Sequence, residues 1–242
     1  MKNGLILLLA LMITACGTER LPPPAENPPA QVEETTEPPE VPETPLTAEE
    51  LAQANKAFSL SENPEKALEL SCFFTSAYED VTELDFEEFL RYYFSGSSDL
   101  WDEDAEEFQA LAGLKGWSEE DMALWGGLPS GLPVPVHRIP RAAVDQTLEA
   151  YAGITAADLK NTEGVLYLPD YDAYYNFTSD YGPGWFEAAE GVRAGDVVRL
   201  RSEPSWWTGG GEVVRELTLR EAEGRWLIQS FTLHPAENGG PS

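Results

Sequence analysis

The chain of 242 residues is poor in cysteine, histidine and basic residues. Two Cys exclude a disulfide framework and a Cys-rich zinc site, and His137 and His234 leave little for a His-based metal centre. Fifteen Lys and Arg stand against 43 Asp and Glu, so the formal charge is −28. This charge argues against nucleic acid as a partner, because phosphate binding needs a basic surface. We therefore predict neither a metal nor another cofactor.

Catalytic motifs with a fixed spacing are also missing. The sequence contains no G-x-S-x-G, no H-E-x-x-H, no Walker A and no G-x-G-x-x-G pattern. The Gly-rich run 207–212 has no Lys after it, which favours a hairpin loop over a phosphate-binding loop. A lone His137 beside Arg138 indicates a structural histidine more than a catalytic base. We expect no catalytic residue and a protein that is not an enzyme.

The first 16 residues read MKNGLILLLALMITAC. After Lys2, residues 5–15 form an apolar run of 11 residues. This is shorter than the roughly 20 residues that span a bilayer, and it fits a secretory signal. The run ends in Ile-Thr-Ala-Cys, which resembles the bacterial lipoprotein signal. The resemblance implies that residues 1–15 are removed and that Cys16 carries a diacylglyceryl group. An ordinary secretory signal is the alternative.

A lipidated Cys16 predicts an extracytoplasmic protein held on the outer leaflet of the cell membrane by its acyl chains. Residues 17–46 contain nine prolines and seven acidic residues against one Arg. Such a composition cannot bury enough apolar surface to fold. We expect residues 16–46 to be a disordered tether, with a Pro-rich docking peptide as the alternative. Cys72 lies in an apolar stretch and is expected to be a buried small hydrophobe.

Hydrophobic periodicity predicts helices first and strands later. Residues 47–50 match a capping box, which predicts the start of a helix. A second helix is expected to start at Asn63-Pro64 and to bury Leu68 and Tyr78. Residues 85–94 give the clearest amphipathic helical pattern. Further helices are predicted over 104–112, 118–125 and 140–151, and an edge strand over 134–139. The predicted strands of the C-terminal part are 164–168, 184–190, 196–202, 212–221 and 225–233.

These elements favour a mixed fold. Glu223-Gly224 marks a tight hairpin, and short Gly turns between neighbouring strands indicate an antiparallel meander. We predict a single α+β domain over residues 47–235, in which an N-terminal helical layer packs on a C-terminal antiparallel β-meander. Residues 236–242 are expected to be a disordered tail.

Segment 170–185 is the most unusual stretch, with six aromatic residues and three Asp. Aromatic faces stack on the C–H surfaces of sugars, and carboxylates accept hydrogen bonds from hydroxyls. The alternative is that these side chains belong to the core. The aspartates also suit a paired-carboxylate glycosidase; they are Asp170, Asp172 and Asp180. The candidate ligand-binding residues are Tyr171, Tyr174, Tyr175, Tyr181 and Trp185, together with Trp206 and Trp207 from a later loop.

Acidic residues also cluster between Asp99 and Glu107, where solvated carboxylates at a helix start are favoured over a calcium site. The motifs V-P-V-H-R-I-P, Y-A-G-I-T and Y-D-A-Y-Y-N-F-T-S-D-Y-G-P-G resemble secreted lipoproteins of Gram-positive gut anaerobes, over most of residues 47–235. That resemblance implies no activity and no catalytic residue.

The leading hypothesis is a membrane-anchored, non-enzymatic lipoprotein that binds an envelope glycan or a partner protein. One alternative is a glycan- or cell-wall-active hydrolase that uses Asp170, Asp172 or Asp180. The other is an inhibitor of cell-wall hydrolases, whose acidic face would match a basic enzyme cleft.

Overall fold

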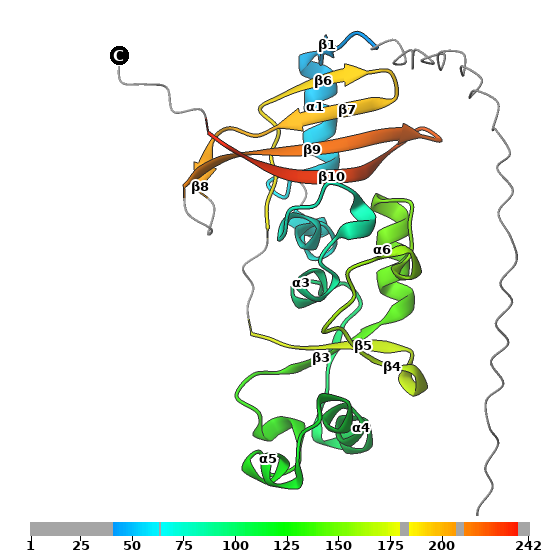
Figure 1. Cartoon of the computed structure of the whole chain (residues 1–242), viewed down its shortest axis with the longest axis vertical. Helices are drawn as coiled ribbons and strands as arrows, with labels where there is room; N and C mark the ends of the chain where they lie inside the picture. Colours follow the sequence, from blue (N-terminus) through cyan, green and yellow to red (C-terminus); the bar gives the residue numbers. More distant parts are fainter. Residues whose placement is uncertain (1–40, 63, 180–183, 207–210, 237–242) are drawn as a thin grey trace, which may run out of the picture. The chain divides into compact units, whose positions relative to one another are not determined.

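The computed structural model describes residues 41–62, 64–179, 184–206 and 211–236 (Figure 1). The predicted signal, Cys16 and most of the predicted tether lie outside these residues, as do Asp180, Tyr181 and Trp207. The described chain begins a compact unit at Val41. Both helices and antiparallel sheets are present, which confirms the α+β class. None of the helices in the described part has the length and apolarity needed to cross a bilayer.

A six-stranded antiparallel sheet contains most of the C-terminal part of the chain. Its strand order is β1-β6-β7-β9-β10, and β8 pairs with β9. The run from β6 to β10 therefore forms the predicted meander. The predicted hairpin is confirmed, since Glu223 and Gly224 both adopt positive φ, at 54° and 72°. The strands are β1 (Thr44–Pro45), β6 (Glu190–Ala194), β7 (Val197–Arg201), β8 (Ser205–Trp206), β9 (Glu212–Ala222) and β10 (Arg225–Pro235).

The two faces of this sheet differ as the period of two predicts. Val198 and Leu200 of β7 are fully buried, and so are their partners Leu219 and Leu217 on β9. Successive strand residues point to opposite faces. The alternate positions of β7 and β9 therefore form an outer face, which carries Arg199, Arg201, Glu216, Thr218 and Arg220.

The predicted strand over 184–190 is wrong, because the paired strand begins only at Glu190. The backbone of Ala188 bonds to a side chain instead. Its N–H donates to Asn55 Oδ1 at 2.8 Å, and its carbonyl accepts from Asn55 Nδ2 at 2.8 Å. Phe186 and Ala188 are buried in the core. The hydrogen bonds of this stretch thus go partly to α1 (Ala48–Phe58) and not to a neighbouring strand.

The predicted capping box of α1 is confirmed, with Thr47 and Glu50 capping each other. The long helix expected after Pro64 is wrong. Only α2 (Ala67–Leu70) is α-helical, between the 3-10 turns η1 (Pro64–Lys66) and η2 (Ser71–Phe74). The four consecutive residues of η2 are all buried, which one face of an α-helix cannot achieve. Leu68, expected in the core, is 51% exposed.

The core confirms several other expectations. Cys72 is fully buried, and burial raises the pKa of its thiol well above the ordinary value. Tyr78 makes an antiparallel bridge with Phe231 of β10. The elements around this core are η3 (Val81–Glu83), α3 (Phe86–Arg91), α6 (Arg141–Tyr151) and η6 (Ala156–Asp158). Residues Phe86, Phe89 and Leu90 of α3 are buried, as the amphipathic pattern predicts.

A second, four-stranded antiparallel sheet is absent from the prediction. Its order is β2-β3-β5-β4, so the strand predicted at an edge lies between β2 and β5, and β5 belongs to the aromatic segment. A separate apolar cluster packs α4 on this sheet, through Phe108, Leu111, Val136 and Tyr175. The strands are β2 (Ser98–Asp99), β3 (Val136–Pro140), β4 (Leu166–Leu168) and β5 (Ala173–Phe177); the helical elements are η4 (Asp102–Asp104), α4 (Ala105–Lys115), α5 (Glu119–Leu124), η5 (Pro129–Gly131) and η7 (Pro169–Tyr171).

Candidate ligand-binding site

Two of the candidate aromatic residues, Tyr174 and Tyr175, belong to the core. They lie on β5 and are 7% and 2% exposed. The Tyr174 ring meets Phe86 edge-on at 5.1 Å between centroids, and burial raises its pKa to about 12. The Tyr175 hydroxyl donates to Glu107, and burial together with this bond raises its pKa. Both side chains therefore belong to the core and not to an exposed aromatic face.

Glu107 is the charged centre of the contacts beneath Tyr175. Its side chain is 4% exposed and forms a two-point ion pair with Arg138, whose Nε lies 2.6 Å from Oε1. Asp104 also accepts from Arg138, at 3.0 Å. The two carboxylates raise the pKa of Arg138, Glu107 most of all. This cluster is a satisfied buried ion pair that joins α4 to the four-stranded sheet.

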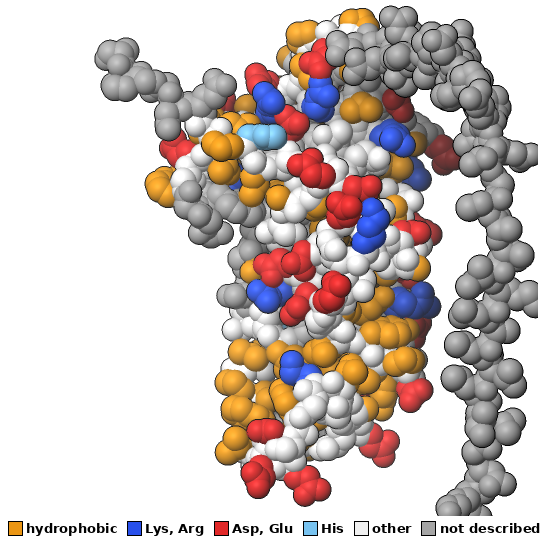
Figure 2. Space-filling view, in the orientation of Figure 1, with side chains coloured by type: hydrophobic (Ala, Val, Ile, Leu, Met, Phe, Trp, Pro, Cys, Tyr) orange, Lys and Arg blue, Asp and Glu red, His pale blue; other side chains and the backbone are white. Residues whose placement is uncertain are grey.

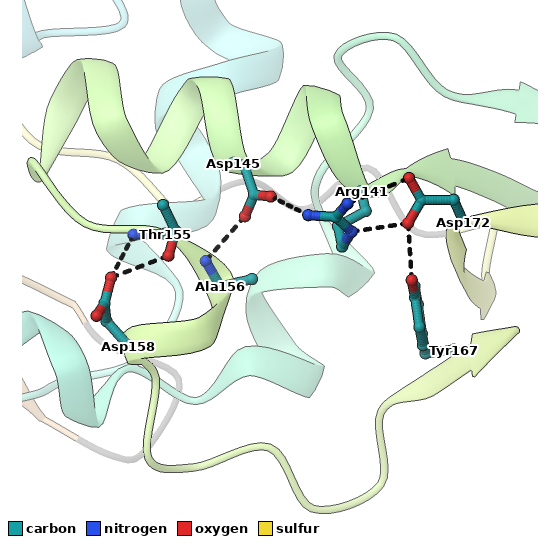
Figure 3. A network of polar contacts seen from close by, with 7 residues as sticks. All are labelled: Arg141, Asp145, Thr155, Ala156, Asp158, Tyr167 and Asp172. Atoms are coloured by element: carbon teal, nitrogen blue, oxygen red, sulfur yellow. Dashed lines mark hydrogen bonds and ion pairs between the residues drawn. The ribbon is translucent and has the colours of Figure 1, made fainter. Parts of the chain in front are cut away.

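Two of the three aspartate candidates are described: Asp170 lies within η7, and Asp172 directly follows it. Asp172 has a left-handed backbone, with φ at 47°. Arg141 Nε donates to its Oδ1 at 2.7 Å, and the Tyr167 hydroxyl donates to the same atom at 2.7 Å (Figure 3). These bonds lower the pKa of Asp172, Arg141 most of all. Asp170 and Tyr171 are exposed on η7.

The contacts of Asp172 extend into a longer network. Arg141 also donates to Asp145 at 2.8 Å, and Asp145 accepts from the backbone of Ala156 at 2.9 Å (Figure 3). The network thereby connects η7, α6 and η6. A general acid of a glycosidase needs a raised pKa. The lowered pKa of Asp172 suits a structural ion pair, not that role.

The remaining described candidates, Trp185 and Trp206, both contact Arg215 of β9. They are 41% and 73% exposed. Arg215 connects them, since its guanidinium carbon lies 4.6 Å from the centre of the Trp185 ring. The same guanidinium donates to Ser205 Oγ and to the Trp206 carbonyl, the latter at 3.3 Å. Arg215 is 2% exposed, and burial lowers its pKa.

The position of Trp185 follows from its neighbours in the chain. Phe186 is buried and packs against Phe74 and Phe231, with centroids 5.7 and 6.3 Å away. Gly184 lies so close to the Phe74 carbonyl that an added Cβ would be 2.1 Å from it. The backbone is therefore held on both sides of Trp185, and the partly exposed ring lies against the buried guanidinium of Arg215.

A hollow of about 570 Å³ lies on the outer face of the sheet, and Pro204, two residues before Trp206 in the chain, is part of its lining. Trp206 pairs with Glu212, two residues from Val214, which lines the hollow. Figure 2 shows charged and apolar side chains together at the end of the sheet that carries β8. The charged or titratable side chains that line the hollow are Glu190, Arg201, Glu203 and His234.

The structure thus divides the predicted site between the two sheets. Arg215 contacts the Trp185 ring and the Trp206 backbone carbonyl, whereas Tyr171, Tyr174 and Tyr175 belong to β5 and the turn before it. Arg215 and His234 were not among the predicted site residues. The sequence pattern does single out Arg215, because this cation occupies an inner-face position between Val213 and Leu217 in the alternating pattern of β9. A cation on an apolar face needs specific partners.

Fold and site define an α+β protein with a ligand-sized hollow on one sheet. Among the described residues, no group of three or more His, Cys, Asp or Glu is placed to hold a metal ion. The chain matches no protein-family model, no curated protein and no solved structure. The functional proposal therefore rests on the residues that line the hollow and on the exposed Trp206 close to them in the chain.

Proposed function

We propose that this protein is a membrane-anchored, extracytoplasmic, non-enzymatic lipoprotein that binds a neutral glycan of the cell envelope. One observation carries the proposal. A hollow of about 570 Å³ includes Pro204 in its lining, and Trp206, two residues further along the chain, has an exposed indole and a backbone carbonyl that accepts from the buried Arg215. Hollows of roughly this size are typical of sites for small ligands.

The side chains around the hollow suit a polyhydroxylated ligand. The indole offers a flat apolar face to the C–H surface of a sugar ring. Glu190 and Glu203 supply acceptors for hydroxyl groups, and Arg201 supplies donors. Because charges of both signs line the hollow, a neutral ligand fits it better than a strongly charged one. The charge of −28 also repels anionic wall polymers.

The hydrolase alternative is less favoured by the geometry. Asp172 is engaged by Arg141 and Tyr167, and Asp170 is exposed on the turn before it. The carboxylates that line the hollow are Glu190 and Glu203, and neither is one of the predicted catalytic aspartates.

A titration with N-acetylglucosamine oligomers tests the proposed site. The expected result is saturable quenching or enhancement of tryptophan fluorescence, with an affinity that falls at least about tenfold in Trp206→Ala. Trp101→Ala is the matched control, because Trp101 is also exposed, at 61%, but lies before η4. Equal affinity in wild type and Trp206→Ala would contradict the site.

The anchor has its own test. Mass spectrometry of the mature protein from its native membrane is expected to find acyl groups on an N-terminal Cys16. An unmodified thiol at Cys16, or a product that keeps Met1, would refute the lipoprotein assignment without affecting the glycan site.

A further inference from the structure

Large apolar side chains are exposed around the end of α5. Leu124 ends this helix and is 75% exposed, Leu128 is 36% exposed, and Trp101 just before η4 is 61% exposed. We name these three residues the distal patch. Figure 2 shows apolar side chains gathered at the end of the domain that carries α5. Exposed apolar groups that gather in this way mark interaction surfaces more often than isolated ones do.

Hydrogen bonds hold the distal patch in place. The side chain of Asp102, next to Trp101, accepts from the backbone N–H and the hydroxyl of Ser130, at 3.1 and 2.9 Å. Gly131 packs on the carbonyl of Trp125, where an added Cβ would lie 1.7 Å from the oxygen. The turn after α5 closes through the Gly127 N–H to the Met122 carbonyl at 2.9 Å. These bonds join the segments that carry Trp101, Leu124 and Leu128.

The segment of the chain that carries the distal patch is mostly acidic. Between residues 98 and 128 the chain has nine acidic residues and one basic residue, Lys115. Glu107 and Asp104 share one cation, Arg138. Asp104 and Asp121 cap helical turns, and the hydrogen bonds that they accept lower the pKa of both carboxyls. They therefore keep their negative charge at neutral pH.

We propose that the distal patch is a docking surface for a basic, amphipathic segment of another protein. Its apolar side chains would cover Trp101, Leu124 and Leu128, and its Lys or Arg side chains would meet the surrounding carboxylates. Charge complementarity of this kind accelerates encounter and suppresses wrong partners. The inference is independent of the proposed glycan site, which lies on the other sheet.

The same charges disfavour the other occupants of an apolar surface. A symmetric contact with a second copy places the same patch against itself, so that two acidic rims would face each other. A bilayer with anionic lipids carries negative surface potential, which attracts basic and not acidic segments. A basic partner is the occupant that gains from both the apolar and the charged groups.

The test uses residues 17–242, which keep the whole compact unit that begins at Val41. The probe is a short helical peptide of Leu and Lys, with leucines on one face, and its binding is followed by fluorescence anisotropy of a labelled copy. We expect saturable binding that weakens as salt is raised. The double variant Trp101→Ala, Leu124→Ser is expected to bind at least about tenfold more weakly.

Matched controls distinguish binding at the distal patch from nonspecific hydrophobic binding elsewhere on the protein. Leu68→Ser and Trp206→Ala change side chains that are 51% and 73% exposed at other places in the fold, so they are expected to leave peptide affinity unchanged. A peptide in which Glu replaces Lys is expected not to bind. Equal melting temperatures of all variants show that each one folds.

Four results would overturn the inference. The first is unchanged peptide affinity in the double variant, and the second is equal binding of the Glu peptide. The third is a concentration-dependent dimer, seen by sedimentation, that Leu124→Ser abolishes, because it would assign the patch to self-association. The fourth is co-sedimentation with anionic vesicles that the double variant loses. Each of these leaves the oligosaccharide titration of the proposed glycan site unaffected.

Discussion

Arg215 and Trp185 form a cation–π pair, with the guanidinium carbon 4.6 Å from the centre of the indole. Because Arg215 is almost completely buried, solvent does not weaken this contact as it does at exposed sites. The arginine also donates to Ser205 and to the Trp206 carbonyl. One buried cation therefore positions both tryptophans of the candidate site.

Replacing this cation tests its positioning role. Arg215→Met keeps an apolar stem but removes the hydrogen bonds to β8, and we expect it to lower the free energy of unfolding by about 1–3 kcal/mol. It is also expected to weaken oligosaccharide binding, because Trp206 loses its backbone support. Denaturant titration measures the first effect and fluorescence titration the second. A variant with full glycan affinity would show that β8 holds Trp206 without Arg215.

The close approach at Gly184 gives a second prediction. In Gly184→Ala the new methyl group would lie 2.1 Å from the Phe74 carbonyl, so we expect a loss of about 1–3 kcal/mol in the free energy of unfolding. Gly113→Ala is the control, since its Cβ would meet nothing within 4 Å. Gly113 lies inside α4, and alanine there is expected to stabilise the protein by up to about 1 kcal/mol. A change in the free energy of unfolding with the same sign in both variants would contradict the steric explanation for Gly184.

The ion pair of Glu107 gives a third prediction. Glu107→Gln removes a buried carboxylate that Arg138 and Tyr175 both contact. We expect it to lower the free energy of unfolding by about 2 kcal/mol, the scale of hydrogen bonds to charged groups. Glu106, the exposed neighbour of Glu107, supplies the control. Glu106→Gln is expected to change the free energy of unfolding by less than about 0.5 kcal/mol. Urea denaturation at neutral pH compares the two.

The pH dependence of stability follows from Asp172. Arg141 and Tyr167 hold its pKa in the folded state below its ordinary value. The stabilisation is therefore complete above the unfolded-state pKa of about 4, and it is lost as pH falls through the lower folded-state value. We expect the difference in melting temperature between wild type and Arg141→Met to be constant near neutral pH and to shrink in acid. A difference that grows on acidification would reverse the assigned sign.

Local signals predicted the elements whose partners are close in the sequence. The capping box of Thr47 and Glu50 needs only residues three apart, and the Glu223-Gly224 turn needs only its own backbone angles. The alternation along β7 and β9 predicted which side chains are buried. The helix expected after Pro64 failed because η2 is buried on all sides, and this depends on the rest of the core.

For the candidate site, too, the sequence predicted some properties and tertiary packing decided the others. The sequence determined which residues carry large aromatic rings, which segment is rich in acidic residues, and that strands follow helices. Tertiary structure decided that Tyr174 and Tyr175 are buried under α3 and α4 while Trp185 and Trp206 are exposed. The physical reason is that burial depends on what packs on a strand, and β5 is covered by residues such as Phe86 and Glu107, about 70 to 90 positions earlier in the chain.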